Sequence, residues 1–371
     1  MKESVLFIIF SLESGGTQKM MVNVINHLEI DQKKVLFIYN DRGNNKYEKN
    51  LNLSIEKYKL NHSNSVFGYI KKIHYLIKII KNENIRIIMS FSSQGSLLGI
   101  LARIFFPFRK VKIINRMVSF DNKLFTQKTK NGFKNKIWDK VLKVFIYKRV
   151  DKIVCQTETM KNELIDNYPV TADKSIVINN YLDLNKIKTS KNEKVDFGYR
   201  YLVLIGHLSE EKNITGLIEA FKEISDKIDV NLIILGDGHM RSDLQKLILS
   251  YKLEKRIFLK GFVDNPFMYI AHAEIFIQNS LYEGLSNVLL EALACEVPII
   301  VTDYPGAKEV ISHGENGYII PKNDNGALSK AILELLNNKT LSDHLRSNTL
   351  SSAKKYAGSI EQYQSLIKKI I

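Results

Sequence analysis

The stretch from Ser280 to Pro298, SLYEGLSNVLLEALACEVP, holds the residue types best suited to chemistry. Glu283 stands in its polar first part, and Glu291 stands in the apolar run that follows, which has helical character. A loop carboxylate can accept hydrogen bonds from sugar hydroxyls, and a carboxylate on a helix can accept them from a ribose diol. Two carboxylates at this spacing are also common on solvated surfaces, so the spacing alone does not decide the function.

Three segments, one of them within this stretch, are suited to binding phosphate. The helix in that stretch should begin near Leu285, Ser286 and Asn287, where the first N–H groups lack partners inside the helix. Lys212 follows the predicted strand Tyr201–Ile205, where a lysine can neutralise a phosphate, although a surface lysine is the plain alternative. Gly15-Gly16 lies between a predicted strand and a helix, so its N–H groups can approach an anion; a tight turn explains the pair equally well.

The elements that must position these residues alternate between short apolar strands and helices in both halves of the chain. This alternation predicts two doubly wound parallel sheets. The polar stretch Lys186 to Asp196 reads as a linker between them. We therefore expect an N-terminal domain over 1–185 and a C-terminal domain over 196–356, with a final helix over 359–371 packing back on the first. Ligands should bind at the carboxyl ends of the strands that face the cleft between the domains.

Length and charge support this division. A chain of 371 residues exceeds what one core usually supports. The formal net charge of +15 comes from the N-terminal half, since residues 1–190 hold 33 basic and 16 acidic side chains. Residues 101–150 alone hold 14 basic and 2 acidic side chains. Such asymmetry indicates a polyanionic partner, and a solvated basic face is the alternative.

The location of the protein follows from three absences in the sequence. Cys155 and Cys295 stand in apolar surroundings with no second ligand nearby, as expected of buried thiols in a reducing compartment. The apolar run Val5–Phe10 is too short for a signal peptide, and no run approaches the length of a spanning helix. We expect a cytoplasmic protein whose membrane contact, if any, is peripheral.

Several motifs occur in one order along the chain. They are Gly15-Gly16, Gly206-His207-Leu208 with Lys212, Gly236-Asp237-Gly238, Gly261-Phe262-Val263, Tyr282 to Ala292, Pro298 to Val310, and Gly314 to Tyr318. Together they resemble the large family of retaining GT-B glycosyltransferases commonly called family 4, or glycosyltransferases group 1. The resemblance is strong from about Leu202 to Pro321 and looser over residues 1–185.

The resemblance implies two Rossmann-like domains, a nucleotide-sugar donor held mainly by the C-terminal domain, and no required metal or cofactor. It implies that Glu283 contacts the donor sugar, Glu291 the ribose, and Lys212 the β-phosphate. The remaining implied donor-binding residues lie near the diphosphate or the base: Gly15, Gly16, His207, Phe262, Val263, Gly284, Leu285, Ser286 and Asn287. In such a fold the last helix crosses back to the first domain, which fits the apolar face formed by Ile360, Tyr363 and Ile367.

Two positions depart from the family pattern. Many members have arginine where this chain has His207, and histidine carries only part of a charge near neutral pH. The phosphate would then depend more on Lys212. Many members also have histidine near the strand that ends at Ile114, where this chain has Arg116; we expect Arg116 to contact a phosphate or the acceptor.

The stretch from Phe120 to Arg149 combines basic and large aromatic residues, including Trp138, the single tryptophan. Such a surface suits docking on an anionic bilayer, where each nearby Lys or Arg contributes roughly 1 kcal/mol. Nucleic acid is the competing partner, but no recognition module for it is present. We expect the membrane, because acceptors in this family are often lipid-linked.

The leading hypothesis is retaining transfer of a hexose or N-acetylhexosamine from a nucleotide sugar, UDP-linked by expectation, to a lipid-linked or surface-polysaccharide precursor. A non-catalytic subunit that activates a partner transferase is an alternative, motivated by His207. A nucleotide-sugar epimerase on the same fold is another, although it needs acid and base side chains that the sequence does not reveal. The donor sugar, the acceptor, the linkage and the oligomeric state are not encoded in any motif.

Overall fold

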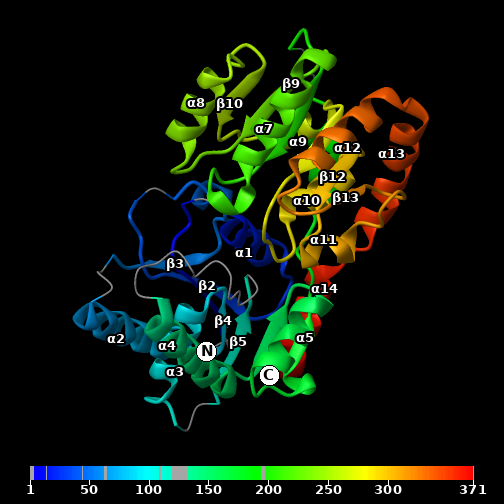
Figure 1. The fold of residues 1–371 in the computed structure, drawn as a ribbon. Coiled ribbons are helices and arrows are strands. Elements are labelled where there is room, and N and C mark those ends of the chain that lie inside the picture. Colours follow the sequence, from blue (N-terminus) through cyan, green and yellow to red (C-terminus); the bar gives the residue numbers. More distant parts are fainter. Residues whose placement is uncertain are drawn as a thin grey trace. The chain divides into compact units, whose positions relative to one another are not determined.

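Both halves of the chain form parallel sheets covered by helices in the computed structural model, which describes residues 4–13, 15–43, 45–61, 65–107, 110–118, 132–193 and 197–370. Of residues 132–137 it describes the backbone alone. The chain divides into two units. Unit 1 holds residues 1–181 and 358–371, and unit 2 holds residues 182–357. Figure 1 gives the labels used below.

The sheet of unit 1 has seven parallel strands in the order β3-β2-β1-β4-β5-β6-β7. The strand order reverses between β1 and β4, which pair directly. Ligands of open α/β sheets bind at the carboxyl ends of the strands at such a reversal. The strands are β1 (Ser4–Ile9), β2 (Lys33–Ile38), β3 (Glu56–Lys59), β4 (Ile85–Ser90), β5 (Lys112–Arg116), β6 (Lys152–Cys155) and β7 (Ser175–Val177).

Helices cover both faces of this sheet. One core joins apolar side chains of β1, β2 and β4 to those of α1 and of α14, including Ile360, Tyr363 and Ile367. The C-terminal helix is therefore part of unit 1. The helices are α1 (Gly16–His27), α2 (Val66–Asn82), α3 (Ser93–Arg103), α4 (Gly132–Arg149), α5 (Glu158–Asn167) and α14 (Ser359–Ile370), with short 3-10 turns at Glu48–Asn50 and Ala172–Lys174.

Unit 2 has six parallel strands in the order β10-β9-β8-β11-β12-β13, and here the order reverses between β8 and β11. Side chains alternate between two cores along each strand. In β8, for example, Leu202 and Leu204 belong to one core and Tyr201 and Val203 to the other. The strands are β8 (Tyr201–Ile205), β9 (Asn231–Leu235), β10 (Ile257–Gly261), β11 (Ile275–Gln278), β12 (Ile299–Thr302) and β13 (Tyr318–Ile320).

The helices of unit 2 follow the same division into two layers. Side chains of α7, α8 and α12 fill one core, and side chains of α9, α10 and α11 fill the other. The helices are α6 (Leu184–Ser190), α7 (Ile214–Ile224), α8 (Arg241–Ser250), α9 (Pro266–Ala271), α10 (Asn287–Ala294), α11 (Pro305–Val310), α12 (Asn325–Asn337) and α13 (Lys339–Lys354). Short 3-10 turns lie at Glu210–Lys212 and Ser225–Lys227.

Two segments differ from the sequence-based expectation. The expected linker from Lys186 to Asp196 begins inside α6, which Asp183 caps by accepting a hydrogen bond from the N–H of Lys186 at 2.9 Å. The boundary between the units therefore lies earlier, at residues 181 and 182. Strand β3, with the sequence EKYK, was not expected, because an exposed edge strand of mostly charged residues has no apolar run to reveal it.

Candidate active site

Two loops of unit 2 bring together the residues most suited to chemistry. Lys212 lies in the loop after β8, and Glu283 lies in the loop after β11. These strands are neighbours at the point where the strand order reverses. Both loops therefore leave the carboxyl edge of the sheet at the position where such sheets usually bind ligands. The N–H of Leu281 donates to the carbonyl oxygen of Glu211 at 2.8 Å, which ties the two loops to each other.

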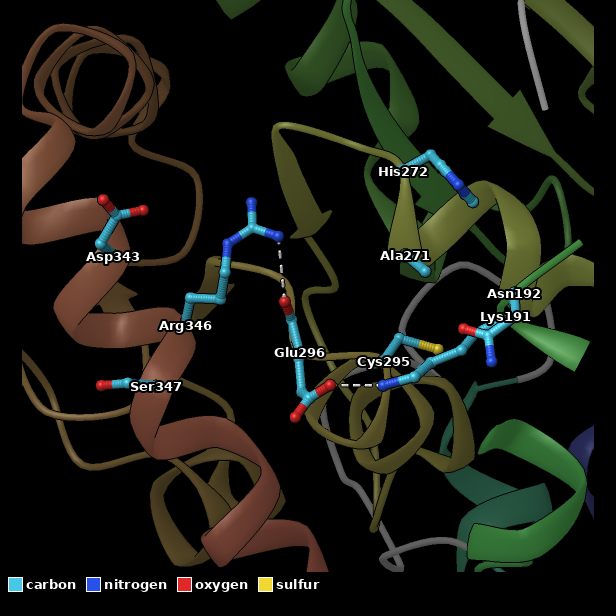
Figure 2. Close-up of a pocket in the computed structure, with 9 residues that line it drawn as sticks. All are labelled: Lys191, Asn192, Ala271, His272, Cys295, Glu296, Asp343, Arg346 and Ser347. Atoms are coloured by element: carbon cyan, nitrogen blue, oxygen red, sulfur yellow. Dashed lines mark hydrogen bonds and ion pairs between the residues drawn. The ribbon is translucent and has the colours of Figure 1, made fainter. Parts of the chain in front are cut away.

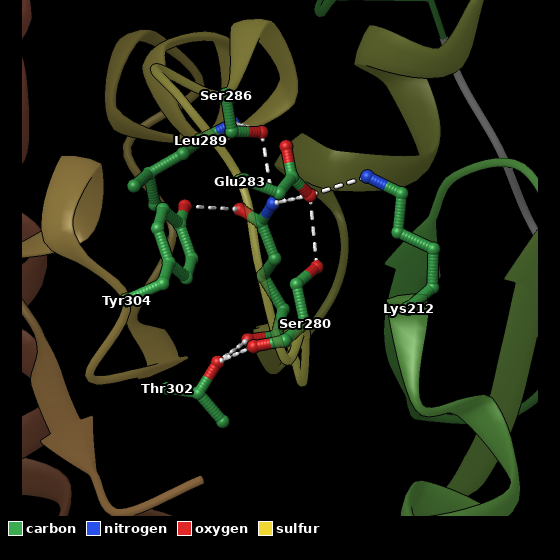
Figure 3. Close-up of polar contacts among 8 residues, drawn as sticks. Lys212, Ser280, Glu283, Ser286, Leu289, Thr302 and Tyr304 are labelled. Carbon is green, nitrogen blue, oxygen red and sulfur yellow. Dashed lines mark hydrogen bonds and ion pairs between the residues drawn. The ribbon is translucent and has the colours of Figure 1, made fainter. Parts of the chain in front are cut away.

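The Glu283 carboxylate is held through one oxygen. Its Oε1 accepts hydrogen bonds from the Lys212 ammonium, from Gln278 Nε2 at 2.6 Å and from Ser280 Oγ at 2.8 Å. Figure 3 shows the other oxygen directed away from these donors. The side chain is 13% exposed. One oxygen thus fixes the orientation of the carboxylate, and the other remains available to accept hydrogen bonds from a ligand.

A buried network supports this carboxylate (Figure 3). Gln278 Nε2 also donates to Ser286 Oγ at 2.9 Å, and the hydroxyl of Tyr304 donates to Gln278 Oε1 at 3.2 Å. The side chains of Gln278, Ser286 and Tyr304 are 4%, 4% and 0% exposed. Because the Tyr304 donor occupies Oε1, the amide of Gln278 must turn its NH₂ toward Glu283 and Ser286. Tyr304 therefore sets the orientation of the group that orients Glu283.

The surroundings of Glu283 favour its ionised form. Burial alone would raise its pKa, but the positive charge of Lys212 and the hydrogen bonds from Lys212, Ser280 and Gln278 outweigh burial and hold the pKa below its usual value. The same negative charge, added to complete burial, raises the pKa of Tyr304 well above its usual value. Tyr304 is therefore a neutral hydrogen-bond donor at physiological pH.

We expect this ion pair to contribute to acid sensitivity. Since the pKa of Glu283 is lower in the folded protein than in the unfolded chain, its contribution to stability is complete above about pH 4.5 and is lost as the pH falls through the folded value. Urea unfolding across the acid range should therefore show a smaller loss of unfolding free energy for Glu283→Gln than for the wild type. Parallel curves for the two proteins would contradict the assignment.

Helix α10 begins directly after the Glu283 loop. Ser286 is its N-cap, and its Oγ accepts a hydrogen bond from the N–H of Leu289 at 3.3 Å. Gly284 and Leu285 complete the turn into the helix. Glu291 lies on α10 and is 6% exposed, so it belongs to the inner part of the unit rather than to a solvated surface. The start of α10 thus places backbone N–H groups beside the anchored carboxylate.

Gly306 supports that turn from α11. A Cβ atom on this residue would lie 1.8 Å from the carbonyl oxygen of Gly284 and 3.3 Å from the backbone nitrogen of Leu285. No side chain fits in this space. The backbone of α11 therefore packs directly against the Gly284 turn, a role of Gly306 that the sequence does not indicate.

The loop after β8 depends on a similar close contact. At Gly236, φ is +129°, and a Cβ there would lie 1.9 Å from the carbonyl oxygen of Gly206. The Gly236-Asp237-Gly238 turn is thus required for the path of the Gly206-His207-Leu208 loop. The aliphatic stem of Lys212 packs across Gly206, and His207 is exposed, with its ring 6.3 Å from that of His239.

The other predicted donor-binding residues lie at strand ends. Phe262 and Val263 follow β10; Phe262 is 45% exposed, and Val263 packs against a core of unit 2. Gly15 and Gly16 follow β1 in unit 1, and Gly16 is the first residue of α1. They are at the reversal of strand order in that sheet, as expected for a phosphate-binding turn.

Arg116 differs from its expected role as a phosphate or acceptor contact. Its side chain is 1% exposed, its Nε donates to the hydroxyl of Tyr363 at 2.8 Å, and an Nη donates to Asn180 Oδ1. Its guanidinium lies over the ring of Phe91. Arg116 therefore joins the end of β5 to the C-terminal helix inside unit 1, and the sequence-based role is corrected to a structural one.

A second Lys–Glu ion pair in unit 2 lies in a different setting. Lys191 contacts Glu296 at the edge of an open hollow of about 670 Å³, where Arg346 also donates to the carbonyl oxygen of Glu296 at 3.2 Å (Figure 2). Among the residues that the structure describes here, no helix start or buried amide network supports this carboxylate in the way described for Glu283. Within the described part of the chain, no cluster of three or more His, Cys, Asp or Glu side chains is placed to hold a metal ion.

Comparison with protein families identifies the chain. A model described as Glycosyltransferase Family 4 matches residues 14–186, and one described as Glycosyl transferases group 1 matches residues 185–352. The chain belongs to glycosyltransferase family 4. The boundary between the two matches falls near the boundary between the two structural units.

The chain is similar in sequence to two named bacterial glycosyltransferases. It is 25% identical over 352 residues, covering 94% of each chain, to the N-acetylgalactosamine-N,N'-diacetylbacillosaminyl-diphospho-undecaprenol 4-alpha-N-acetylgalactosaminyltransferase of Campylobacter jejuni. It is 24% identical over 297 residues, covering 76% of each chain, to the capsular polysaccharide biosynthesis glycosyltransferase CapM of Staphylococcus aureus.

Solved structures confirm the expected GT-B fold of this glycosyltransferase. Anabaena HepE in complex with UDP and glucose superposes with a TM-score of 0.81 at 16% identity, covering 99% of this chain and 98% of that one. Sucrose-phosphate synthase from Thermosynechococcus elongatus gives a TM-score of 0.82 at 14% identity, covering 100% and 99%. At these identities the likeness concerns the fold.

Proposed function

We propose that this glycosyltransferase moves a hexose or N-acetylhexosamine, with retention, from a UDP-linked donor to a lipid-linked or surface-polysaccharide precursor. The observation that carries the proposal is the Glu283 carboxylate, fixed through Oε1 beside the start of α10 and in contact with Lys212. Relatives whose names include transfer to a diphospho-undecaprenol acceptor and capsule biosynthesis support the acceptor class. The UDP-bound neighbour supports the nucleotide.

Each group has one task in the proposed reaction. Glu283 Oε2 accepts hydrogen bonds from sugar hydroxyls, Glu291 from the ribose, and Phe262-Val263 lie by the base. As the glycosidic bond breaks, negative charge grows on the departing diphosphate. Lys212 and the N–H groups from Gly284 to Asn287 stabilise that charge.

Lys212 can serve Glu283 and a phosphate together, because an ammonium group has three donors. A donor phosphate oxygen takes the acceptor's proton on the face from which the diphosphate leaves. We propose no protein base and no metal, since a lysine and a helix start supply positive potential at the diphosphate.

We also propose that the enzyme works at the cytoplasmic face of the cell membrane, where a lipid-linked acceptor would lie. None of the described helices is both long and apolar enough to cross a bilayer. Part of the basic stretch from Phe120 to Arg149 lies outside the described residues. Within the described part, Trp138 on α4 is 72% exposed, as expected of a side chain that contacts lipid headgroups.

Calorimetric titration with UDP, GDP and the corresponding sugars tests the proposal. We expect UDP to bind, and Lys212→Met to weaken binding by about tenfold or more, because a charge-assisted hydrogen bond contributes roughly 1.5–3 kcal/mol. Lys191→Met removes a second Lys–Glu pair of unit 2 and should leave UDP affinity unchanged. Binding of GDP alone would overturn the donor assignment, and binding of no nucleotide would favour a non-catalytic subunit.

A further inference from the structure

Helix α2 exposes an apolar stripe in its first turns. Val66, Phe67 and Ile70 are 80%, 66% and 57% exposed, and their spacing of three and four residues places them on one side of the helix. The opposite side, which includes Leu76 and Ile79, is buried. A surface helix normally has one apolar side, so a second one that is exposed in the described part of the chain is typical of a docking surface.

Helix α4 repeats this pattern. Trp138, Val141 and Leu142, again three and four residues apart, are 72%, 52% and 39% exposed. Both α2 and α4 pack against α3, and the connections through α2, α3 and α4 all advance along the sheet in the same direction. Right-handed crossovers therefore place the three helices on one face of the sheet.

Both helices begin at the ligand edge of unit 1, and each stripe lies in the half of its helix nearer that edge or at its middle. Because the strands are parallel, α2 leaves the carboxyl end of β3 and α4 follows the carboxyl end of β5, so each helix begins at the edge where such sheets bind ligands. Ile104 and Phe105 are similarly exposed, at 66% and 63%, but follow the end of α3, at the opposite edge. They are not part of the proposed surface.

The charge around these stripes is positive. Helix α2 carries no acidic residue and four lysines, of which Lys72 is buried, and the ammonium of Lys71 lies 4.7 Å from the centre of the Phe67 ring. Helix α4 carries six basic residues and one acidic residue, Asp139. By contrast, α5 carries three acidic residues and one lysine. Exposed apolar side chains surrounded by lysines suit a partner with an apolar interior and negatively charged groups at its surface.

We infer that the exposed stripes of α2 and α4 dock unit 1 on an anionic lipid bilayer, with Phe67 and Trp138 entering the headgroup region. This inference rests on the proposed lipid-linked acceptor, whose reactive end would then be delivered at the carboxyl edge of the sheet. Like charge on the two helices opposes pairing with a second copy of this chain. Aliphatic side chains such as Val66 and Ile70 give no favourable contact to a nucleic-acid backbone, so lipid fits the surface better.

Flotation of the full chain with vesicles tests the inference. We expect binding to phosphatidylcholine vesicles that contain phosphatidylglycerol, weaker binding to phosphatidylcholine alone, and loss of the difference at high salt. Phe67→Ser should weaken binding to the anionic vesicles about tenfold or more, because it removes an aromatic side chain that would be buried in the headgroup region. Thermal unfolding should be unchanged, because Phe67 is exposed in solution.

Phe105→Ser is the matched control, because it removes the same side chain at nearly the same exposure from the opposite edge. We expect it to bind vesicles like the wild type. Equal binding by Phe67→Ser and the wild type, or equal loss by both variants, would overturn the inference. A change in molecular mass for Phe67→Ser in light scattering would instead assign the stripe to pairing of two chains. UDP binding, measured separately, reports on the proposed function independently of vesicle binding.

Discussion

Replacing Glu283 by glutamine is expected to lower kcat/KM for glycosyl transfer by about a thousandfold. Glutamine keeps the shape of the side chain but loses the negative charge that holds Lys212, and its amide offers only one accepting oxygen. The oxygen that remains must serve either the donors around Oε1 or the sugar, and it cannot serve both. Steady-state kinetics with a UDP-sugar and membrane extract as acceptor source would measure the loss.

Glu296→Gln provides the control for that variant. It alters a second glutamate of unit 2 that contacts a lysine, at an open hollow away from the Gln278–Tyr304 network (Figure 2). We expect kcat/KM within about twofold of the wild type, since surface ion pairs contribute roughly 0–1 kcal/mol. Near-normal turnover by Glu283→Gln would reject the site, and an equal loss in both variants would show that the effect is not specific to it.

Gly306→Ala should lower activity about a hundredfold without any change in a charged or polar group. The new Cβ would stand 1.8 Å from the Gly284 carbonyl oxygen, so the turn into α10 must move. A displacement of about 1 Å at a site that positions a substrate can cost roughly a hundredfold in rate. We also expect the free energy of unfolding to fall by about 1–3 kcal/mol, as for other overpacked sites.

Gly326→Ala separates this effect from the general cost of replacing a glycine. Gly326 lies in the first turn of α12 in the same unit, and a Cβ there would meet only Asp324 Oδ1, at 3.5 Å. We expect wild-type activity and a change in unfolding free energy within about 1 kcal/mol. Urea unfolding and UDP titration of both variants would show whether Gly306→Ala acts on the donor site. Wild-type turnover by Gly306→Ala would contradict a role for this contact.

The strands and most helices could be predicted from local sequence because their signal is local. Buried strands such as Val5–Ile9 and Ile275–Ile277 are apolar runs that end in polar or glycine residues, and parallel sheets covered on both faces require such runs. The segments that sequence analysis missed carry no such run. Strand β3 is EKYK at a sheet edge, and α6 is LNKIKTS with Ile187 as its one buried side chain.

The candidate site could be predicted in part, because only some of its residues belong to short local motifs. Glu283, Lys212 and the start of α10 belong to motifs a few residues long, so their types and order were visible in the sequence. Gln278 had a weak signal, as a polar residue that closes an apolar strand. Tyr304 and Gly306 belong to the motif from Pro298 to Val310, but the sequence indicates no role for either, because their partners lie more than 20 residues away along the chain.

The sequence by itself determined the two alternating halves and the residue types at the ends of their strands, because hydrophobic period and turn chemistry act over a few residues. Only the tertiary structure decided which atoms meet. The sequence predicts a ligand contact for Arg116, whereas the structure pairs it with Tyr363, 247 residues later. Contacts of that separation depend on how β5 and α14 pack, which no local pattern encodes. The same holds for Glu283, since the oxygen that it presents to a ligand depends on donors from β8 and β11 loops and on a tyrosine beyond β12.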